Sequence, residues 1–240
     1  MSGRISHAQA PRRGFTLVEL LVVIIIISVL AAIAVPAVMR TITSARNAAI
    51  KSEIDLLHMA IMNYKNEYGS FPPCVDVSPS TSGNPAQKHV ARLFARSNPS
   101  TQFGWLSALS PLNAITVWLS GYTTDPTSPL LPLTSRKKLF DFDMSRVNQT
   151  TGAYTASGKP NSPYIYINSP YYGSTGSPTT FSDGINTYSA QVLPPLGTSF
   201  QNADTFQILS AGRDEIYGNE DDLSNFWPGT RKDYLDSLSN

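Results

Sequence analysis

Apolar residues are gathered in one long run near the N-terminus. Residues 20–39 read LLVVIIIISVLAAIAVPAVM, and only Ser28 and Pro36 interrupt their apolar character. At about 1.5 Å per residue, a helix of this length covers about 30 Å, the thickness of the hydrocarbon core of a bilayer. The run therefore predicts a membrane-spanning helix. Pro36 is expected to kink it, because proline removes a backbone donor and clashes with the preceding turn.

The pattern beyond the run predicts that the same helix continues outside the membrane. Apolar residues recur there at spacings of four, three, four, three and four, which places them on one face of an α-helix. These positions are Ile50, Ile54, Leu57, Ile61, Tyr64 and Tyr68. Gly69 then supplies a C′ residue, and Pro72 and Pro73 prevent further helix. One long helix over residues 15–68 is expected, with its outer half packed against a globular head.

The head, residues 69–240, is polar and rich in turn residues. Its periodicity predicts short helices over residues 87–96 and 105–119. Strand signals come late, at residues 164–167 and 205–209, and are expected to form neighbouring antiparallel strands. The fold class is therefore α+β, with a long N-terminal helical spine packed on a small antiparallel β-sheet head that carries long loops.

The segment between the two predicted strands is rich in Gly, Ser, Thr, Pro and Tyr. Residues 171–199 include Asp183 and Gly184, and their composition predicts a long surface loop.

Composition and charge exclude several classes of function. The chain has 18 Lys and Arg against 17 Asp and Glu, and this near-neutral charge removes the electrostatic case for nucleic-acid binding, which would need a basic face. A single cysteine, Cys74, excludes an intrachain disulfide and a multi-cysteine metal site. The sequence has no nucleophile elbow, phosphate loop or cluster of metal-ligand residues, so no enzymatic activity is expected.

Charges around the apolar run predict its orientation. Arg12 and Arg13 precede it, and the run contains no lysine. Because basic residues stay on the cytoplasmic side, the N-terminus is expected in the cytoplasm and everything after Met39 outside it.

One acidic residue, Glu19, stands at the mouth of the run, with no Lys or Arg one helical turn away on either side. An ionised carboxylate costs about 2.5–3.5 kcal/mol at the bilayer centre and less near the interface. Either Glu19 stays solvated at the headgroup level, or its partner comes from another chain.

The residues around Glu19 carry a family resemblance. Arg13-Gly14-Phe15-Thr16-Leu17-Val18-Glu19 resembles the prepilin cleavage and methylation motif of type IV pilins and type II secretion pseudopilins. Residues 64–72 are similar to the helix exit of pseudopilins. The resemblance implies cleavage between Gly14 and Phe15 and N-methylation of Phe15. It also implies that Glu19 pairs with the N-terminal ammonium of a neighbouring subunit during assembly.

The resemblance also implies the organisation of the chain. Residues 1–14 would be the leader peptide, and residues 15–40 the transmembrane and assembly helix. Residues 41–68 would be the amphipathic half of the spine. Residues 69–240 would form a periplasmic head of the pilin fold with an acidic, calcium-type loop near its C-terminus.

That acidic loop is a candidate Ca²⁺ site. Residues 210–225 concentrate acidic residues in a glycine-containing turn, and Ca²⁺ takes six to eight oxygen ligands. The spacing does not match an EF-hand, so a solvated acidic turn remains an alternative. The loop is similar to the C-terminal calcium loop of the type II secretion major pseudopilin. The ligands implied by this resemblance are Asp214, either Asp221 or Asp222, Ser224, and a backbone carbonyl near Leu209.

The function implied is that of a structural subunit of a type II secretion pseudopilus, which drives protein export across the outer membrane. Expected partners are further copies of the chain, other pseudopilins, the prepilin peptidase and N-methyltransferase, and the inner-membrane secretion platform. The subunit would span the inner membrane once, and the assembled filament would lie in the periplasm.

Two alternatives remain open. The first is a type IV pilin, major or minor, for adhesion, motility or DNA uptake. The second is an exported soluble or membrane-tethered binding protein. Ala32-Ile33-Ala34 looks like a secretory cleavage site, although the apolar stretch is longer than an ordinary signal sequence and contains Glu19.

Overall fold

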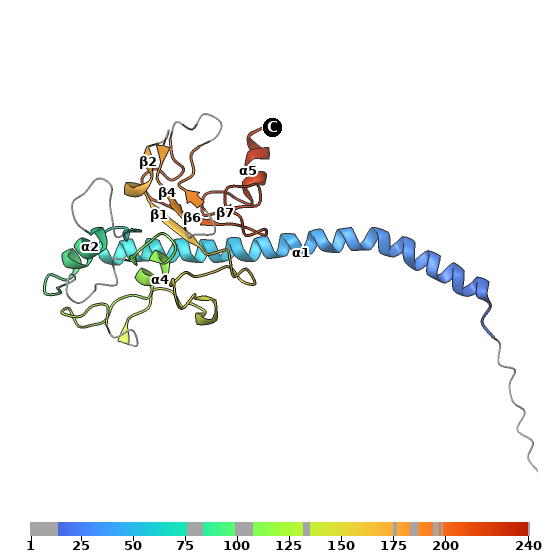
Figure 1. Ribbon diagram of the computed structural model, residues 1–240, viewed down its shortest axis with the longest axis horizontal. Coiled ribbons are helices and arrows are strands. Elements are labelled where there is room, and N and C mark those ends of the chain that lie inside the picture. Colours follow the sequence, from blue (N-terminus) through green and yellow to red (C-terminus); the bar gives the residue numbers. More distant parts are fainter. Residues whose placement is uncertain are drawn as a thin grey trace, which may run out of the picture. The chain divides into compact units, whose positions relative to one another are not determined.

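The chain forms one long helix and a head of short helices, strands and loops (Figure 1). It divides into two compact units, Met1–Ser44 and Ala45–Asn240, which are considered separately. The computed structural model describes residues 14–75, 84–98, 108–131, 135–174, 177–182, 187–193, 197 and 199–239.

Helix α1 spans Leu17–Tyr68 and confirms the predicted spine. It starts two residues later than expected, because Thr16 is its N-cap. The helix runs unbroken through Pro36 and bends within its N-terminal part (Figure 1). It ends where the sequence predicted: Gly69 has a φ of +79°, and its N–H donates to the Lys65 carbonyl over 2.7 Å. This left-handed C′ conformation is the one that glycine adopts without steric cost.

A three-stranded antiparallel sheet lies in the head. Its order is β1-β6-β7, and the strands are Ile165–Asn168, Phe206–Ser210 and Leu223–Ser224. In the register, Ile165 lies opposite Leu209, and Leu209 lies opposite Ser224. Every residue of β1 and β6 is buried. The two predicted strands are thus antiparallel neighbours, as expected.

The short helices differ from the prediction in their ends. Helix α2 spans Pro85–Leu93, because the Asn84 side chain caps the Gln87 N–H at 3.0 Å and proline fits the first turn. The helix predicted over 105–119 forms only at α4, Ala114–Leu119. Over residues 108–113 that prediction is wrong: Pro111 lies there, and the Asn113 side chain accepts from the Ser110 N–H to close a turn instead. Residues 105–107 lie outside the described part.

Two small hairpins and a terminal helix also appear. Strands β2, Gly173–Ser174, and β3, Ser177–Pro178, form one hairpin, while β4, Thr180–Ser182, and β5, Thr187–Ser189, form the other. The prediction of a long surface loop over residues 171–199 is therefore wrong where these strands form. An Asp-Gly pair between residues of high β-propensity favours a hairpin, and the chain has this pair at Asp183 and Gly184. These two residues themselves lie outside the described part of the chain. Helix α5, Arg231–Leu238, was not predicted; it begins at a Thr230–Asp233 capping box. Single 3₁₀ turns occur at Met144–Arg146 and Ser169–Tyr171.

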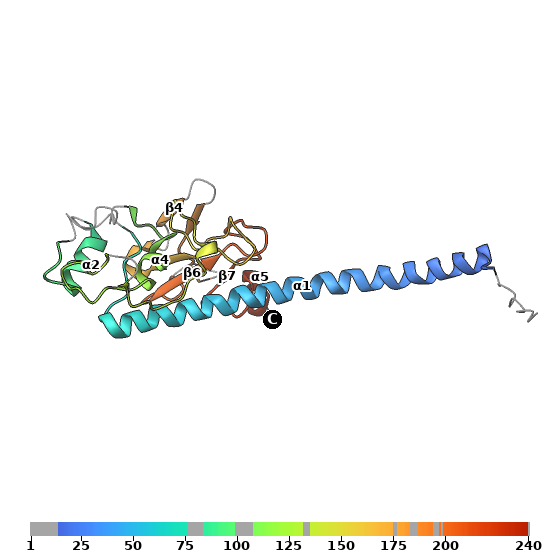
Figure 2. The same cartoon turned by 90° about the horizontal axis from the view of Figure 1, so that it is seen from below.

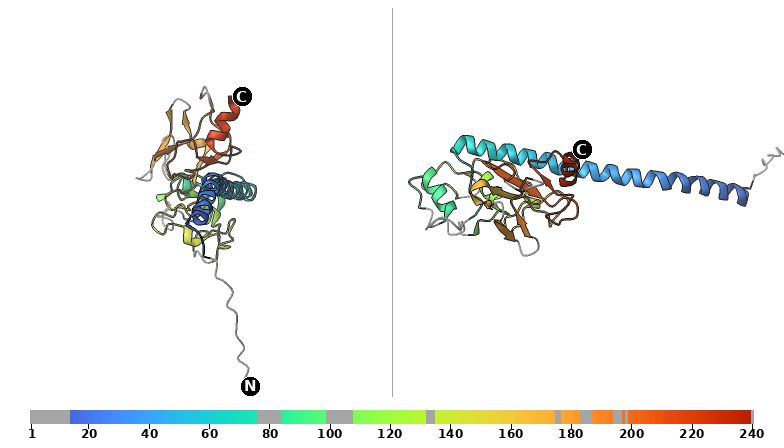
Figure 3. Two further views of the ribbon diagram at one scale, coloured as in Figure 1. Left: turned by 90° about the vertical axis from the view of Figure 1, so that its right-hand side faces the viewer. Right: turned by 90° about the horizontal axis from the view of Figure 1, so that it is seen from above.

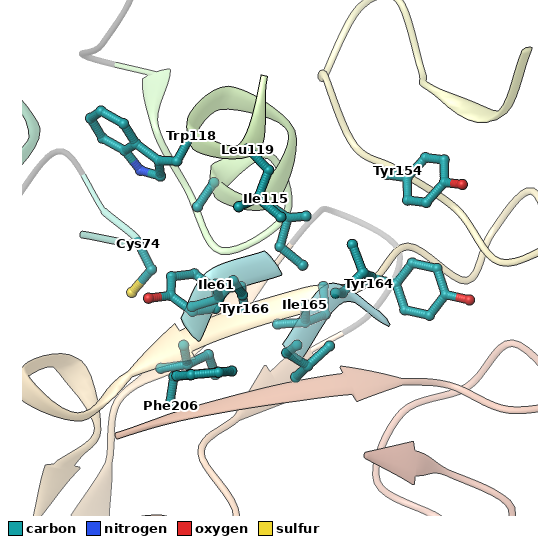
Figure 4. Packing of buried hydrophobic residues seen from close by; sticks show 14 of the residues in the cluster. Ile61, Cys74, Ile115, Trp118, Leu119, Tyr154, Tyr164, Ile165, Tyr166 and Phe206 are labelled. Atoms are coloured by element: carbon teal, nitrogen blue, oxygen red, sulfur yellow. The ribbon is translucent and has the colours of Figure 1, made fainter. Parts of the chain in front are cut away.

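The core of the head is built on one face of α1. The outer half of α1 lies along one side of the head (Figures 2 and 3). Ile54, Leu57 and Tyr64 are completely buried there, as the 4-3 spacing predicted. Around them pack Trp118 from α4 and the strand residues Tyr166 and Phe206 (Figure 4).

The buried aromatic rings are fixed by hydrogen bonds. The Trp118 indole donates to the Pro73 carbonyl over 2.7 Å, and the Tyr166 hydroxyl donates to the Pro72 carbonyl over 2.9 Å. Tyr64 bonds the His89 Nε2 atom at 2.7 Å. Burial, with the nearby Arg92 charge, lowers the pKa of His89 to about 4, so this imidazole is neutral at physiological pH.

Two neighbouring leucines on α1 test the assignment of the head-facing side. Leu57→Ala should lower the free energy of unfolding by about 2–5 kcal/mol, because it leaves a cavity in a closed core. Leu56→Ala, at a position that is 54% exposed, should change it by less than about 1 kcal/mol. Denaturant unfolding of the detergent-solubilised chain, followed by tryptophan fluorescence, measures both. Equal effects would contradict this orientation of the helix.

Candidate functional site

The bond predicted to be cleaved lies just before α1. Gly14, Phe15 and Thr16 are exposed and lie outside any helix or strand. Gly14 has no positive φ, and a Cβ placed on it would meet no atom within 4 Å. The described part of the chain therefore does not require glycine at position 14.

Thr16 and Glu19 form a capping box on the first turn of α1. The Glu19 carboxylate accepts from the Thr16 backbone N–H at 2.9 Å and from its hydroxyl at 2.8 Å. The Thr16 hydroxyl in turn accepts from the Glu19 N–H at 3.2 Å. This arrangement satisfies donors that a helix start leaves unpaired. Among the described residues, Glu19 thus has hydrogen-bond donors as partners and no cation.

An apolar surface follows this turn. Most of the large apolar side chains that are exposed among the described residues lie between Phe15 and Ile42. By its length and composition, α1 contains a stretch that could cross a membrane. Such a surface is too large to be left in water, so lipid or other helices must cover it.

The acidic loop near the C-terminus is closed by two of its own carboxylates. Asp221 accepts from the backbone N–H groups of Arg213 and Asp214, at 2.7 and 3.2 Å. Asp214 accepts from the Ile216 N–H at 2.9 Å and from the Asn219 amide at 2.6 Å. Both carboxylates therefore hold the turn together within the chain.

Asp222 is different, because its side chain is buried. Only 4% of the residue is exposed, and Oδ2 accepts from the Gly218 N–H at 2.7 Å. Oδ1 is buried with no hydrogen-bond partner among the described residues. Burial raises the pKa of Asp222 to about 7, against the lowering effects of the Gly218 bond and the Arg231 charge. An ionised carboxylate in this position needs a cation.

Asp222 and Leu209 line one cavity of about 160 Å³. This cavity lies between the β4–β5 hairpin and the acidic loop. Its wall also contains Thr180, Thr187, Tyr188, Ser189, Gln191, Tyr217 and Gly218. Of the predicted ligands, the structure brings only Asp222 and Leu209 to this cavity. The Ser224 hydroxyl instead accepts from the Phe226 and Trp227 N–H groups, at 3.3 and 3.1 Å.

The residues that line this cavity are compatible with a hard cation bound mainly by uncharged oxygen ligands. The described residues contain no group of three or more His, Cys, Asp or Glu side chains placed to hold a metal. One carboxylate with an orphan oxygen, together with carbonyl and hydroxyl oxygens, is still a donor set that Ca²⁺ accepts. A low count of charged ligands is typical of the weak sites of extracellular proteins, with dissociation constants of about 0.1–1 mM.

The loop is also held by cations of the protein itself. The Lys159 ammonium donates to the Arg213 carbonyl and lies 3.5 Å from Glu215. The Arg231 guanidinium donates to the Gly218 carbonyl over 2.7 Å. These contacts tie the acidic loop to neighbouring segments at Arg213, Glu215 and Gly218.

A further carboxylate, Glu53 on the outer half of α1, has partners that no sequence pattern indicated; Glu53 and these donors form the Glu53 cluster. Glu53 accepts two bonds from Arg146, at 2.8 and 2.6 Å, and one each from the hydroxyls of Tyr154 and Tyr164, at 2.7 and 2.5 Å. Burial alone would raise the pKa of Glu53, but these four bonds lower it. The donors come from positions about 90–110 residues away, so no local spacing reveals them.

Comparison with known proteins identifies the N-terminal segment. Residues 10–35 match the prokaryotic N-terminal methylation motif, and this range includes Gly14, Phe15 and Glu19. No curated protein and no solved structure matches the chain significantly. The chain thus carries a prepilin-type motif followed by an apolar helix and a pilin-like α+β fold, a combination consistent with type IV pilin-like proteins.

The Glu53 cluster yields a stability prediction. Glu53→Gln should lower the free energy of unfolding by about 2–4 kcal/mol at pH 7, because it breaks an ion pair that is largely shielded from water. The pKa of Glu53 is lowered on folding, so this contribution is present above pH 4.5 and is lost as the pH falls through the folded-state value.

A matched control lies on the same helix. Glu67 pairs with Lys137 at 3.0 Å on an exposed surface, so Glu67→Gln should cost less than about 1 kcal/mol. Unfolding of both variants at pH 7 and pH 3.5 measures the difference. A Glu53→Gln chain as stable as the control at pH 7 would contradict the role given to Glu53.

Proposed function

We propose that the protein is a structural subunit of a type II secretion pseudopilus, polymerised through α1 to drive export across the outer membrane. The observation that carries this proposal is the methylation motif at the exposed start of a long helix whose first half is apolar and uncovered. An apolar helix behind such a motif indicates an inner-membrane anchor with the head in the periplasm. Any catalytic step in this pathway would be carried out by the partners of the subunit.

The first turn of α1 provides the chemistry of assembly. Cleavage between Gly14 and Phe15 would place an ammonium group one residue before the Thr16 N-cap. Glu19 then exchanges its Thr16 donors for the ammonium of a neighbouring subunit. In a medium of low dielectric, that ion pair is strongly attractive, whereas either charge alone is costly. Partner exchange at Glu19 therefore favours the polymer over the single chain in the membrane.

The expected partners follow from this role. Proteins with the motif are processed by a prepilin peptidase and polymerise. We further propose that the same peptidase methylates Phe15, and that other pseudopilins and the inner-membrane secretion platform assemble the filament.

The acidic loop favours a pseudopilin over the alternative, a type IV pilin. We propose that Ca²⁺ binds at the cavity beside Asp222, with the Asp222 carboxylate and the Leu209 backbone carbonyl among its ligands. Asp214, Asp221 and Ser224, the other residues expected from the sequence, would join only by exchanging their present hydrogen bonds. The orphan oxygen of Asp222 supports this proposal. When bound, the ion would neutralise that carboxylate and link β6 to the loop.

Processing is tested at the N-terminus of the membrane-associated protein. We expect the first peptide to begin with N-methylated Phe15 by mass spectrometry. Gly14→Val should retain the leader and abolish polymerisation, because the side chain fits this chain but not a peptidase that needs close backbone approach.

The control is Gly3→Val, a substitution of the same size farther from the bond, which should be processed normally. A mature protein that begins at Val35 would instead establish the secretory-signal alternative and overturn the filament proposal.

Calcium binding is tested by unfolding the protein in 10 mM CaCl₂ and in EGTA. At a dissociation constant of about 0.1–1 mM, Ca²⁺ should stabilise the wild-type chain by about 1.5–3 kcal/mol. Asp222→Asn should abolish this difference, and in EGTA at pH 8 it should be more stable than the wild type, because it removes a buried ionised carboxylate.

Asp204→Asn, at an exposed acid outside the loop, should behave as the wild type does. A calcium effect that survives in Asp222→Asn would rule out the proposed ligand. The absence of any effect in the wild type would leave the acidic loop as a structural turn and remove the argument for a pseudopilin over a pilin.

A further inference from the structure

Another cavity, of about 330 Å³, lies at the end of the head where α1 stops. Three segments that are far apart in the sequence form its wall: the chain just after α1, helix α2, and the end of β1 with the 3₁₀ turn that follows it. Figures 1 and 2 show α2 at the same end of the head as the C-terminus of α1. We call this cavity the tip pocket; its wall includes Phe71, Pro73, Lys88, Arg92, Asn168 and Tyr171.

One part of this wall is apolar. Five of its ten described residues are prolines or aromatics. Phe71 packs edge-on against the buried Phe206, with ring centres 5.1 Å apart, and the Trp118 indole donates to the Pro73 carbonyl over 2.7 Å. These contacts with the core fix the apolar part of the wall in place. A cavity of this size, with apolar walls and a few polar groups, is typical of a site for a small ligand.

Arg92 brings a positive charge to the tip pocket. Its Nη2 atom donates to the Ser70 hydroxyl and lies 3.3 Å from the His89 Nδ1 atom, and both of these groups are uncharged at physiological pH. Among the described residues, no carboxylate forms a salt bridge with Arg92. Its Nε and Nη1 groups have no partner there either, and a guanidinium presents such donors in a fork that matches a carboxylate.

Two lysines add to the positive charge around the same wall. Lys88 lines the tip pocket four residues before Arg92, so both lie on one face of α2. The Lys65 ammonium lies 4.4 Å from the centre of the Phe71 ring, which is itself part of the wall. None of the described lining residues is acidic. Because like charges repel one another, an anion bound among these three cations would be stabilised.

Asn168 adds an unused hydrogen-bond acceptor. The residue ends β1 and lines the tip pocket, and only 4% of it is exposed. Its Oδ1 atom is buried and has no hydrogen-bond partner among the described residues. A buried acceptor without a partner is unfavourable, so a ligand that brings an N–H or O–H group to this oxygen would gain free energy on binding.

These three features together specify a ligand. It must carry an anion for Arg92, a donor for Asn168 and an apolar group for the walls beside Phe71. The last residue of a polypeptide carries all three within a few bonds, as its α-carboxylate, its backbone N–H and its side chain. We infer that the tip pocket binds the C-terminal residue of a partner polypeptide that ends in an apolar side chain and a free carboxylate.

An acidic sugar is the main alternative ligand. It would also offer a carboxylate, and one of its hydroxyls could donate to Asn168. A sugar ring, however, carries further hydroxyls around its edge, and the prolines of the wall have no N–H to pair with them. The apolar part of the wall therefore favours a peptide. This binding needs only the head, so it can be measured on the unassembled chain and does not depend on the proposed function.

The ligand class is tested with two peptides that differ in one group. Acetyl-Gly-Leu with a free C-terminal carboxylate should bind the detergent-solubilised full-length chain with a Kd of about 0.1–1 mM, as expected for a ligand of about 16 non-hydrogen atoms. Its C-terminal amide should bind about tenfold more weakly or worse, because it lacks the charge. Ligand-observed NMR titration measures both, with the signal from empty micelles subtracted. Equal affinities would overturn the inference.

Two arginines allow a matched test of the site. Arg92→Gln should weaken binding of the carboxylate peptide about tenfold or more, because it removes a charge-assisted hydrogen bond. Arg96→Gln should leave binding unchanged, since Arg96 is exposed and is not among the described residues of the wall. Both variants should unfold at the wild-type midpoint, as exposed substitutions usually do. A peptide that binds the wild type and Arg92→Gln equally well would place its site elsewhere.

Asn168→Leu separates binding from stability. It should weaken peptide binding about threefold or more without lowering the unfolding midpoint, because it removes an acceptor that is unpaired in the free chain. A lower midpoint with unchanged affinity would show that Asn168 is merely structural and would contradict its role in the site. Arg92→Gln tests the tip pocket independently of this buried position.

Two further probes and the assembly assay complete the test. D-glucuronate that binds more tightly than the peptide would overturn the inference in favour of an acidic sugar. Acetate that binds as tightly as the peptide would show an unspecific anion site and would also overturn it. Arg92→Gln should be processed and polymerise as the wild type does. A wild-type chain that forms no filament but binds the peptide would overturn the proposed function and leave the tip pocket standing.

Discussion

The burial of one row of α1 beneath the head is the contact on which the rest of the head depends. Ile54, Leu57 and Tyr64 are fully buried, and the sheet and α4 are packed around them. At about 25 cal/mol per Å² of apolar surface, such side chains contribute about 1.5–3 kcal/mol each. The row also fixes which way every other residue of this helix turns. Glu53 reaches its donors on the head only because this row faces inward.

Three carboxylates differ in how completely the chain satisfies them. Glu53 accepts four hydrogen bonds, two of them from Arg146. Its charge is therefore balanced within the chain, and its role is to stabilise the fold. Among the described residues, Glu19 has only the uncharged donors of Thr16, and Asp222 retains a buried oxygen with no hydrogen-bond partner. A buried or membrane-bound carboxylate without a cation is unfavourable, so the proposed ammonium of a second subunit at Glu19 and the proposed Ca²⁺ at Asp222 would each be stabilising.

Local patterns predicted the elements with strong periodicity. The 4-3 spacing and Gly69 predicted the course and end of α1, and β-rich runs predicted β1 and β6. Long-range and capping features were missed. The four donors to Glu53 lie far away in sequence, and α5 depends on a Thr230–Asp233 box on a short polar segment. For the loop, the resemblance implied Asp221 or Asp222 as a ligand, but the burial of Asp222 beside a cavity that the β4–β5 hairpin also lines depends on tertiary structure that no local pattern reveals.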